Sequence, residues 1–196
     1  HGFLQRGHVN GAAQRRLRER NGDFNVQIIA VALEQLMRPH GDQNLQVARR
    51  AAAFDMRILY YSHRRNERAE AAFGAQYAPL ETLLGEADFV SLHVPLTEET
   101  RHMMDAQALA CMKKGAYLIN TARGAVVDAR ALADALRSGQ LGGAAIDVFD
   151  GEPCTDSPLH GLDSVILTPH IGTYTQEIYV RMDVEAARNA VRCLTC

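Results

Sequence analysis

Tryptophan is absent from this chain of 196 residues, and the chain holds only six prolines and four cysteines. Four cysteines at this length do not form a disulfide framework. Cys193 and Cys196 also lack the second pair that would complete a zinc site. Because the histidines show no metal-ligand spacing either, we predict no metal.

The chain also lacks a large excess of charge of one sign and long apolar runs. The formal net charge is −2, so no strong field favours nucleic acid or an anionic membrane as a partner. No apolar run approaches the roughly 20 residues of a membrane-spanning helix, and the start at His1 shows no leader pattern. We therefore expect a cytoplasmic fragment whose partner is a small molecule.

Apolar residues are abundant enough for a core, since 47% of the chain is hydrophobic and 22% is charged. Short apolar runs of strand length recur from residue 57 onward, with helical periodicity between several of them. This alternation indicates an α/β fold with a doubly wound, Rossmann-like parallel sheet and helices on both faces. The runs are Arg57–Tyr61, Phe89–Val94, Tyr117–Asn120, Ala144–Phe149 and Val165–Leu167.

Two of the intervening helices have clear end signals. Asp105 is predicted to cap the first helix, which Gly115 ends, and the second is predicted to run from Asp128 to Gly139.

The first 40 residues have a weaker pattern. Residues 1–25 are rich in arginine, glutamine, asparagine and glycine. Val26–Arg38 is predicted as one amphipathic helix, which Pro39 and Gly41 end.

Three chemically distinctive side chains follow the ends of predicted strands. Arg123 follows YLIN, Glu152 follows AAIDVF, and His170 follows VILT. Ligands of such sheets bind beyond the carboxyl ends of the strands. A guanidinium grips a carboxylate with two hydrogen bonds, and an imidazole moves a proton near neutral pH. A carboxylate beside an imidazole favours its charged form. The set suits reduction of a 2-keto acid.

These residues lie within longer motifs that resemble the D-isomer-specific 2-hydroxyacid dehydrogenase family, which includes glyoxylate and hydroxypyruvate reductases. The motifs are "ADFVSLHVPLTEETRHMM", "INTARGAVVDARALADALRSGQLGGAAIDVFDGEP" and "VILTPHIG". The resemblance implies that Arg123 binds the substrate carboxylate, that His170 is the acid/base, and that Glu152 holds and tunes His170.

The same resemblance implies a nicotinamide cofactor. Asp147, which is costly to bury in an apolar strand without a partner, matches the residue that contacts the nicotinamide carboxamide. Segments matching His93-Val94-Pro95 and Thr100 lie along the cofactor, mostly through backbone. Further positions expected at the cofactor are Thr121, Ala122 and Gly172.

Cofactor choice is usually set at the end of the second strand, where an acidic residue binds the ribose 2′-hydroxyl. This chain has Ser62, Arg64 and Arg65 there. A hydroxyl followed by arginines suits a phosphate. We therefore expect NADP(H) to be favoured, with NAD(H) possible; a solvated basic turn is the other interpretation.

The chain departs from the family pattern at its first strand and its glycine loop. Gln43, Asn44 and Gln46 stand where a phosphate loop needs glycine, and no strand is expected before them. Residues 1–40 are therefore expected to be a partly helical, unmatched segment, and 41–196 the dinucleotide-binding domain. Most of the substrate domain is expected to be absent. The sequence predicts weak or no binding of NADPH or NADH to this chain alone.

Two functions remain at this point. The first is an oxidoreductase that transfers a hydride between NAD(P)H and a small 2-keto acid such as glyoxylate or hydroxypyruvate, as a homodimer in the intact enzyme. The alternative is a nucleotide-sensing regulator or an inactive truncated interaction module. Turnover of glyoxylate by the purified chain distinguishes them.

Overall fold

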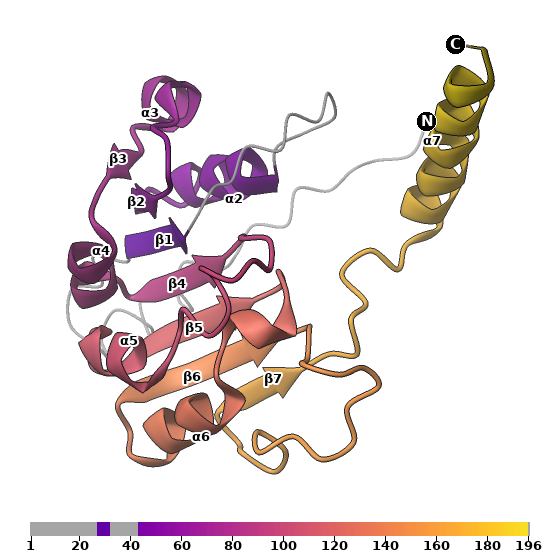
Figure 1. Ribbon diagram of the computed structural model, residues 1–196. Coiled ribbons are helices and arrows are strands. Elements are labelled where there is room, and N and C mark those ends of the chain that lie inside the picture. Colours follow the sequence, from indigo (N-terminus) through magenta and orange to yellow (C-terminus); the bar gives the residue numbers. More distant parts are fainter. Residues whose placement is uncertain (1–26, 32–42, 196) are drawn as a thin grey trace, which may run out of the picture.

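The computed structural model describes residues 27–31 and 43–195, whose core is one parallel sheet of seven strands (Figure 1). The strand order is β3-β2-β1-β4-β5-β6-β7, and all neighbouring pairs are parallel. The sheet runs outward in both directions from β1 and β4, which is the doubly wound arrangement. The strands are β1 Gln27–Val31, β2 Arg57–Tyr61, β3 Gln76–Tyr77, β4 Phe89–Leu92, β5 Ala116–Asn120, β6 Leu141–Ile146 and β7 Val165–Leu167.

Helices pack on both faces of the sheet because residues of a strand alternate between the faces. In β2, Ile58 and Tyr60 join a small apolar cluster with α2 and α3, whereas Leu59 joins the large cluster beneath α4, α5 and α6. The helices are α2 Gln43–Ala52, α3 Glu67–Phe73, α4 Leu80–Glu86, α5 Ala106–Cys111, the 3₁₀ turn η1 Gly124–Val126, α6 Ala129–Arg137 and α7 Gln176–Thr195. The predicted doubly wound α/β fold is confirmed.

Strand β1 corrects two expectations from the sequence. Gln27–Val31 is a strand and not part of a helix, and it pairs with β2 on one side and β4 on the other. The first strand is therefore present. A five-residue apolar run cannot be told from a buried helix segment by periodicity alone; here the hydrogen-bonding partners on both sides decide. The rest of the expected helix, and Gly41 with its loop, lie outside the described residues.

Of the other predicted strands, β2 and β7 have the predicted bounds, β5 begins one residue earlier, and β4 ends at Leu92 and not at Val94. β6 both begins and ends three residues earlier than the predicted Ala144–Phe149. Gly143 lies close to the ring of Tyr117, and a Cβ at Gly143 would lie 2.9 Å from that ring. Strand-length apolar runs thus locate the sheet, while glycines extend β6 beyond the apolar run.

The predicted cap Asp105 and the predicted helix start at Asp128 are both found, whereas α5 ends at Cys111 and not at Gly115. Asp105 accepts a hydrogen bond from the backbone N–H of Ala108 at 2.8 Å, at the start of α5. Asp128 accepts one from the N–H of Arg130 at 2.9 Å, at the start of α6. These carboxylates satisfy donors that have no partner within the helix.

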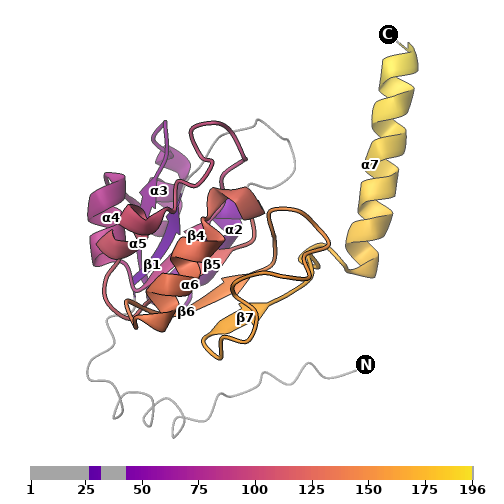
Figure 2. The same ribbon diagram turned by 60° about the horizontal axis from the view of Figure 1, so that its bottom comes forward.

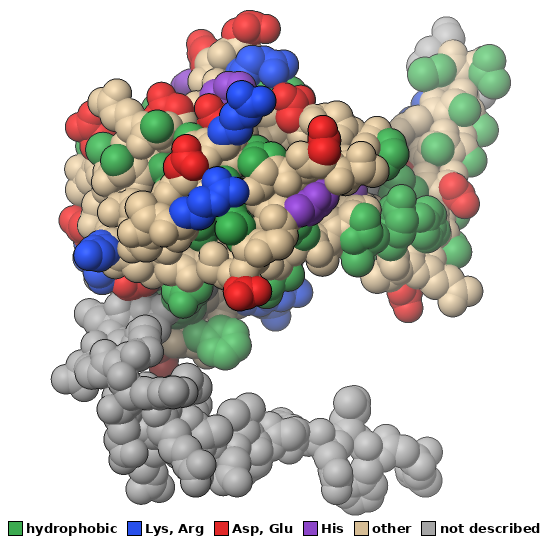
Figure 3. All heavy atoms as spheres, turned by 90° about the horizontal axis from the view of Figure 1, so that it is seen from below, with side chains coloured by type: hydrophobic (Ala, Val, Ile, Leu, Met, Phe, Trp, Pro, Cys, Tyr) green, Lys and Arg blue, Asp and Glu red, His purple; other side chains and the backbone are tan. Residues whose placement is uncertain are grey.

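Helix α7 extends away from the sheet, as Figure 2 shows. Its apolar side chains are exposed, and Figure 3 shows them along the helix; they include Tyr179, Val180, Met182, Val184, Val191 and Leu194. One face of the sheet is also open near β5 and β7, where Tyr117 and Ile166 are 44% and 68% exposed. Within the described ranges, no helix is long and apolar enough to span a bilayer.

A proline in β1 tests whether this strand is part of the folded sheet. Ile29→Pro removes the N–H that β1 offers to a neighbouring strand, so we expect a loss of about 2–3 kcal/mol of unfolding free energy. For a chain of this size this is roughly 5–10 °C in the melting temperature by circular dichroism. Ile29→Val keeps the N–H and is expected to lose much less. Equal melting of Ile29→Pro and the wild type would show that β1 is not paired.

Candidate active site

The three strands that carry the predicted chemistry are neighbours at one end of the sheet. β5 pairs with β6, and β6 pairs with β7, all in parallel. The segments that follow them therefore meet at one edge, where Figure 1 shows the loops after β5, β6 and β7 side by side. This edge holds Arg123, Glu152 and His170.

Glu152 and His170 are joined by a side-chain hydrogen bond. The Glu152 carboxylate lies 2.7 Å from Nδ1 of His170, and its other oxygen accepts the backbone N–H of Phe149 at 2.9 Å. The hydrogen bond to His170, followed by that from Phe149, lowers the pKa of Glu152. The two side chains are 35% and 47% exposed. The structure therefore brings together the predicted acid/base and its carboxylate, with Nε2 of His170 outside this contact.

Asp147 has the partners that a buried carboxylate needs. It is 7% exposed, and it accepts hydrogen bonds from the Thr168 hydroxyl and from the N–H groups of Ile171 and Gly172, both at 3.0 Å. Burial raises the pKa of Asp147, but these hydrogen bonds outweigh it, so that the pKa is lowered. Asp147 thus fastens the segment on both sides of His170 to β6.

Asn120 shapes the turn that presents Arg123. Its side chain is buried, donates to the carbonyl of Arg123 at 2.9 Å and accepts the N–H of Ala122 at 3.0 Å. The guanidinium of Arg123 is exposed and donates to the carbonyl of Ala122 at 2.6 Å. It makes no ion pair with any described residue. The guanidinium can therefore grip a carboxylate.

Gly124 brings the Arg123 turn against the loop of Glu152. A Cβ at Gly124 would lie 2.0 Å from the carbonyl carbon of Phe149 and 2.3 Å from the nitrogen of Asp150. Real side chains never approach a backbone so closely, so this contact requires glycine. It fixes the distance between the expected carboxylate-binding group and the expected acid/base pair.

A second group of predicted residues lines a cleft of about 530 Å³ at the end of β2. We call it the adenosine cleft, because the expected dinucleotide would place its adenosine ribose at the end of the second strand. One wall is the turn after β2, and the other is the segment after β4. Its lining includes the predicted Ser62, Val94, Pro95 and Thr100, with Tyr61, His63, Leu80, Thr97, Glu98, Glu99 and Met103. His93 lies outside the lining, and its Nε2 is 2.8 Å from the Ser91 hydroxyl.

Arg65 already has an anionic partner within the chain. Its guanidinium donates two hydrogen bonds of 3.0 Å to the carboxylate of Glu70, which also accepts from the Tyr60 hydroxyl. The hydrogen bonds from Arg65 and Tyr60 lower the pKa of Glu70. The Ser62 hydroxyl likewise donates to the carbonyl of Arg64. Of the basic turn, only the Arg64 guanidinium has no partner among the described residues.

The family assignment comes from a match to residues 40–172, most of the region just described. The matching family is described as D-isomer specific 2-hydroxyacid dehydrogenase, NAD binding domain. This chain belongs to the D-isomer-specific 2-hydroxyacid dehydrogenase family. The matched range contains β2 to β7 and the segments that follow β5, β6 and β7, whereas β1 precedes it.

Curated relatives in this dehydrogenase family include glyoxylate reductases. Those of Pyrococcus furiosus and Thermococcus litoralis are 51% and 50% identical over 145 residues, which is 74% of this chain and 43% and 44% of theirs. The chain thus spans less than half the length of these relatives.

Solved structures agree with the fold. D-Lactate dehydrogenase from Aquifex aeolicus, complexed with NAD and lactic acid, aligns with a TM-score of 0.76 at 31% identity, over 94% of this chain and 61% of that one. A glyoxylate reductase from Paecilomyes thermophila aligns at 0.72 and 33%, over 90% and 53%.

Several side chains of this dehydrogenase domain were not singled out from its sequence. The quoted motifs contain Asn120, Gly124 and Thr168, but the sequence does not show their contacts. Asn120 bonds to backbone groups, Gly124 lies against the backbone of Phe149, and Thr168 bonds to the distant Asp147. Glu70 lies on α3, where only its spacing from Arg65 hints at a pair. Of the other predicted cofactor positions, Thr121 is exposed, Ala122 is buried, and the Gly172 N–H is used by Asp147.

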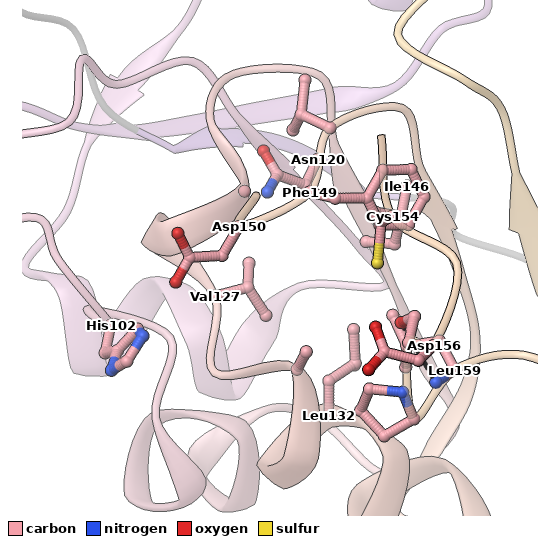
Figure 4. Close-up of a pocket in the computed structure, with 15 residues that line it drawn as sticks. His102, Asn120, Val127, Leu132, Ile146, Phe149, Asp150, Cys154, Asp156 and Leu159 are labelled. Atoms are coloured by element: carbon pink, nitrogen blue, oxygen red, sulfur yellow. Dashed lines mark hydrogen bonds between the residues drawn. The ribbon is translucent and has the colours of Figure 1, made fainter. Parts of the chain in front are cut away.

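A smaller hollow of about 190 Å³ lies between α6 and the loop after β6 (Figure 4). His102, Asp150, Cys154 and Asp156 stand around it together with apolar side chains such as Val127 and Leu132. It includes none of Arg123, Glu152 and His170. No cluster of three or more metal-ligating side chains occurs in residues 27–31 and 43–195.

Removal of the Asp147 charge tests whether its hydrogen bonds to the His170 segment stabilise the fold. Asp147→Asn puts an amide NH₂ opposite backbone donors, so we expect about 2 kcal/mol less unfolding free energy at pH 7, measured by urea denaturation. Because the folded-state pKa is lowered, the carboxylate stabilises the fold above the ordinary aspartate value of about 3.9. This stabilisation is lost as the pH falls through the folded-state value. The difference should persist at pH 5 and shrink below about pH 4.

The exposed Asp150, on the same loop, provides the matched control. Asp150→Asn should change the unfolding free energy by less than about 0.5 kcal/mol. Equal stability of Asp147→Asn and Asp150→Asn at pH 7 would show that the Asp147 hydrogen bonds do not stabilise the fold.

Proposed function

We propose that this chain is the nucleotide-binding part of an oxidoreductase that reduces a small 2-keto acid with a nicotinamide cofactor, as a glyoxylate or hydroxypyruvate reductase does. The observation that carries this proposal is the Glu152–His170 pair at the same sheet edge as the unpaired Arg123. A carboxylate-binding group beside a proton donor suits a 2-keto acid. The glyoxylate reductases among the relatives support the same substrate class.

Each side chain has a distinct part in the proposed reaction. Arg123 binds and orients the substrate carboxylate through two hydrogen bonds. His170 gives a proton to the oxygen of the reduced carbonyl, and Glu152 holds its Nδ1 so that Nε2 is the nitrogen that transfers the proton. A bound nicotinamide supplies the hydride. Asp147 keeps the His170 segment in place.

The cofactor end supports a nicotinamide dinucleotide. The adenosine cleft lies at the carboxyl ends of β2 and β4, next to β1, where such sheets bind their ligands. We further propose that NADP(H) is favoured over NAD(H). The turn after β2 has no acidic side chain, and it carries Arg64, whose guanidinium has no partner among the described residues. Arg65 is not expected to bind the 2′-phosphate, because its guanidinium is already bound by Glu70.

The intact enzyme requires more chain than is present here, because the chain spans less than half of the related glyoxylate reductases. We propose that the missing half supplies the substrate domain and that the intact enzyme is a homodimer. Weak cofactor binding by the chain alone remains a prediction. With β1 in place, it rests only on Gln43, Asn44 and Gln46 at the glycine positions. A chain unable to bind the cofactor would favour the alternative of an inactive interaction module.

Substitution of Arg123 tests the substrate contact in an active enzyme in which a substrate domain completes this domain. Arg123→Ala should reduce kcat/KM for glyoxylate about a hundredfold, since a two-hydrogen-bond charged contact contributes about 3 kcal/mol. The Kd for the cofactor should be nearly unchanged. Arg130→Ala, an exposed arginine on α6, is the control and should retain activity. Unchanged kcat/KM for Arg123→Ala would remove Arg123 from the site.

The basic turn is tested by two single substitutions in the same completed enzyme. Arg64→Ala should weaken NADPH binding about tenfold and NADH binding little, because only NADPH carries the 2′-phosphate. Arg65→Ala should have the smaller effect on the ratio of the two affinities, since its guanidinium is held by Glu70. Fluorescence titration of both cofactors measures this. Equal losses for NADPH and NADH would make the turn a solvated surface.

A further inference from the structure

We propose that Glu99 is a positioning residue that limits the preference for NADP(H), because its carboxylate attracts the imidazole of His63 and competes for it with a 2′-phosphate. This inference rests on the proposed function, since it takes the adenosine cleft as the cofactor site. It adds a residue to that function: an acidic side chain that acts on cofactor choice from the wall opposite the basic turn.

The adenosine cleft has an imidazole on one wall and two carboxylates on the other. His63 belongs to the turn after β2, whereas Glu98 and Glu99 belong to the segment after β4. Nε2 of His63 lies 3.6 Å from a carboxylate oxygen of Glu99, so the two walls approach each other at these side chains. Both side chains are largely exposed, at 62% and 78%. The contact therefore stands at the mouth of the cleft rather than within its buried floor.

Glu99 is held on a rigid turn. The Thr100 hydroxyl donates to the carbonyl of Pro95 at 2.7 Å and accepts the N–H of Thr97 at 2.8 Å. The Thr97 hydroxyl in turn accepts the N–H of Thr100 at 3.2 Å. These bonds close the backbone from 95 to 100 and fix the origin of the Glu99 side chain. The fold thus fixes the backbone that carries Glu99 opposite His63.

His63 matters because the basic turn has few groups left for an anion. Arg65 is bound by Glu70, and the Ser62 hydroxyl donates to a backbone carbonyl. The donors left for a 2′-phosphate are Arg64 and the imidazole of His63. The Glu99 carboxylate, 3.6 Å from Nε2, is too far for a hydrogen bond, but it attracts the imidazole electrostatically and competes with a phosphate for it. An exposed histidine turns readily between rotamers, so removal of the carboxylate frees it.

The experiment uses the purified full chain and two isomeric probes, adenosine 2′-phosphate and adenosine 5′-phosphate, titrated by NMR. These probes carry the same charge and differ in where the phosphate lies. Glu99→Gln should tighten the 2′-isomer about threefold to tenfold, as expected for one nearby exposed charge, and leave the 5′-isomer unchanged. Glu81→Gln removes an equal charge from an exposed position on α4, outside the cleft lining and without the His63 contact, and it should change neither affinity by more than about twofold.

A double-mutant cycle identifies the path of the effect. In His63→Ala chains, Glu99→Gln should no longer tighten the 2′-isomer selectively, because the imidazole that it would free is gone. A merely structural role for Glu99 would move both isomers together and would not depend on His63.

The outcomes separate this inference from the proposed function. Binding of the 5′-isomer with no selective gain in Glu99→Gln overturns the inference and leaves the cleft as the cofactor site. An equal gain for both isomers, or the same gain in Glu81→Gln, also overturns it. If neither probe binds to any variant, the cleft is not an adenosine site, and the inference falls together with the cofactor part of the proposed function.

Discussion

At Gly124 the turn after β5 passes so close to the backbone of Phe149 that no side chain fits between them. The rest of the site depends on this contact. On one side of it Asn120 presents Arg123, and on the other the Phe149 N–H holds Glu152 against His170. Two loops that approach without a side chain between them cannot shift independently, so the group expected to bind a carboxylate keeps a fixed distance from the group expected to transfer a proton.

The carboxylates of the site are held mostly by backbone donors. Asp147 accepts two backbone N–H groups and a hydroxyl, and Glu152 accepts one N–H besides its contact with His170. His170 itself has a φ of 55°, which is uncommon for a residue other than glycine. The bonds from Asp147 to the two residues after His170 keep it in that conformation. The lowered pKa values of both carboxylates follow from the same hydrogen bonds.

At the turn after β2, the charge counted along the sequence differs from the charge that is available to bind a ligand in the folded protein. The sequence places two arginines after β2, which suits a phosphate. In the fold, Glu70 binds one of them, and Glu99 reaches the neighbouring His63 from the opposite wall. A net charge counted along the turn therefore overstates what a 2′-phosphate would encounter. Partners across a cleft come from other elements and cannot be read from local spacing.

The sequence by itself determined the α/β alternation, the bounds of β2 and β7, the cap Asp105, the helix start at Asp128, and the meeting of Arg123, Glu152 and His170 at one sheet edge. These follow from local patterns and from parallel strands ending together. Only the tertiary structure made Gln27–Val31 a strand, because an apolar run of five residues takes its form from the hydrogen-bonding neighbours it finds. Only the tertiary structure, too, gave Asp147 its donors and Arg65 its acceptor, because these partners meet through folding and not through spacing.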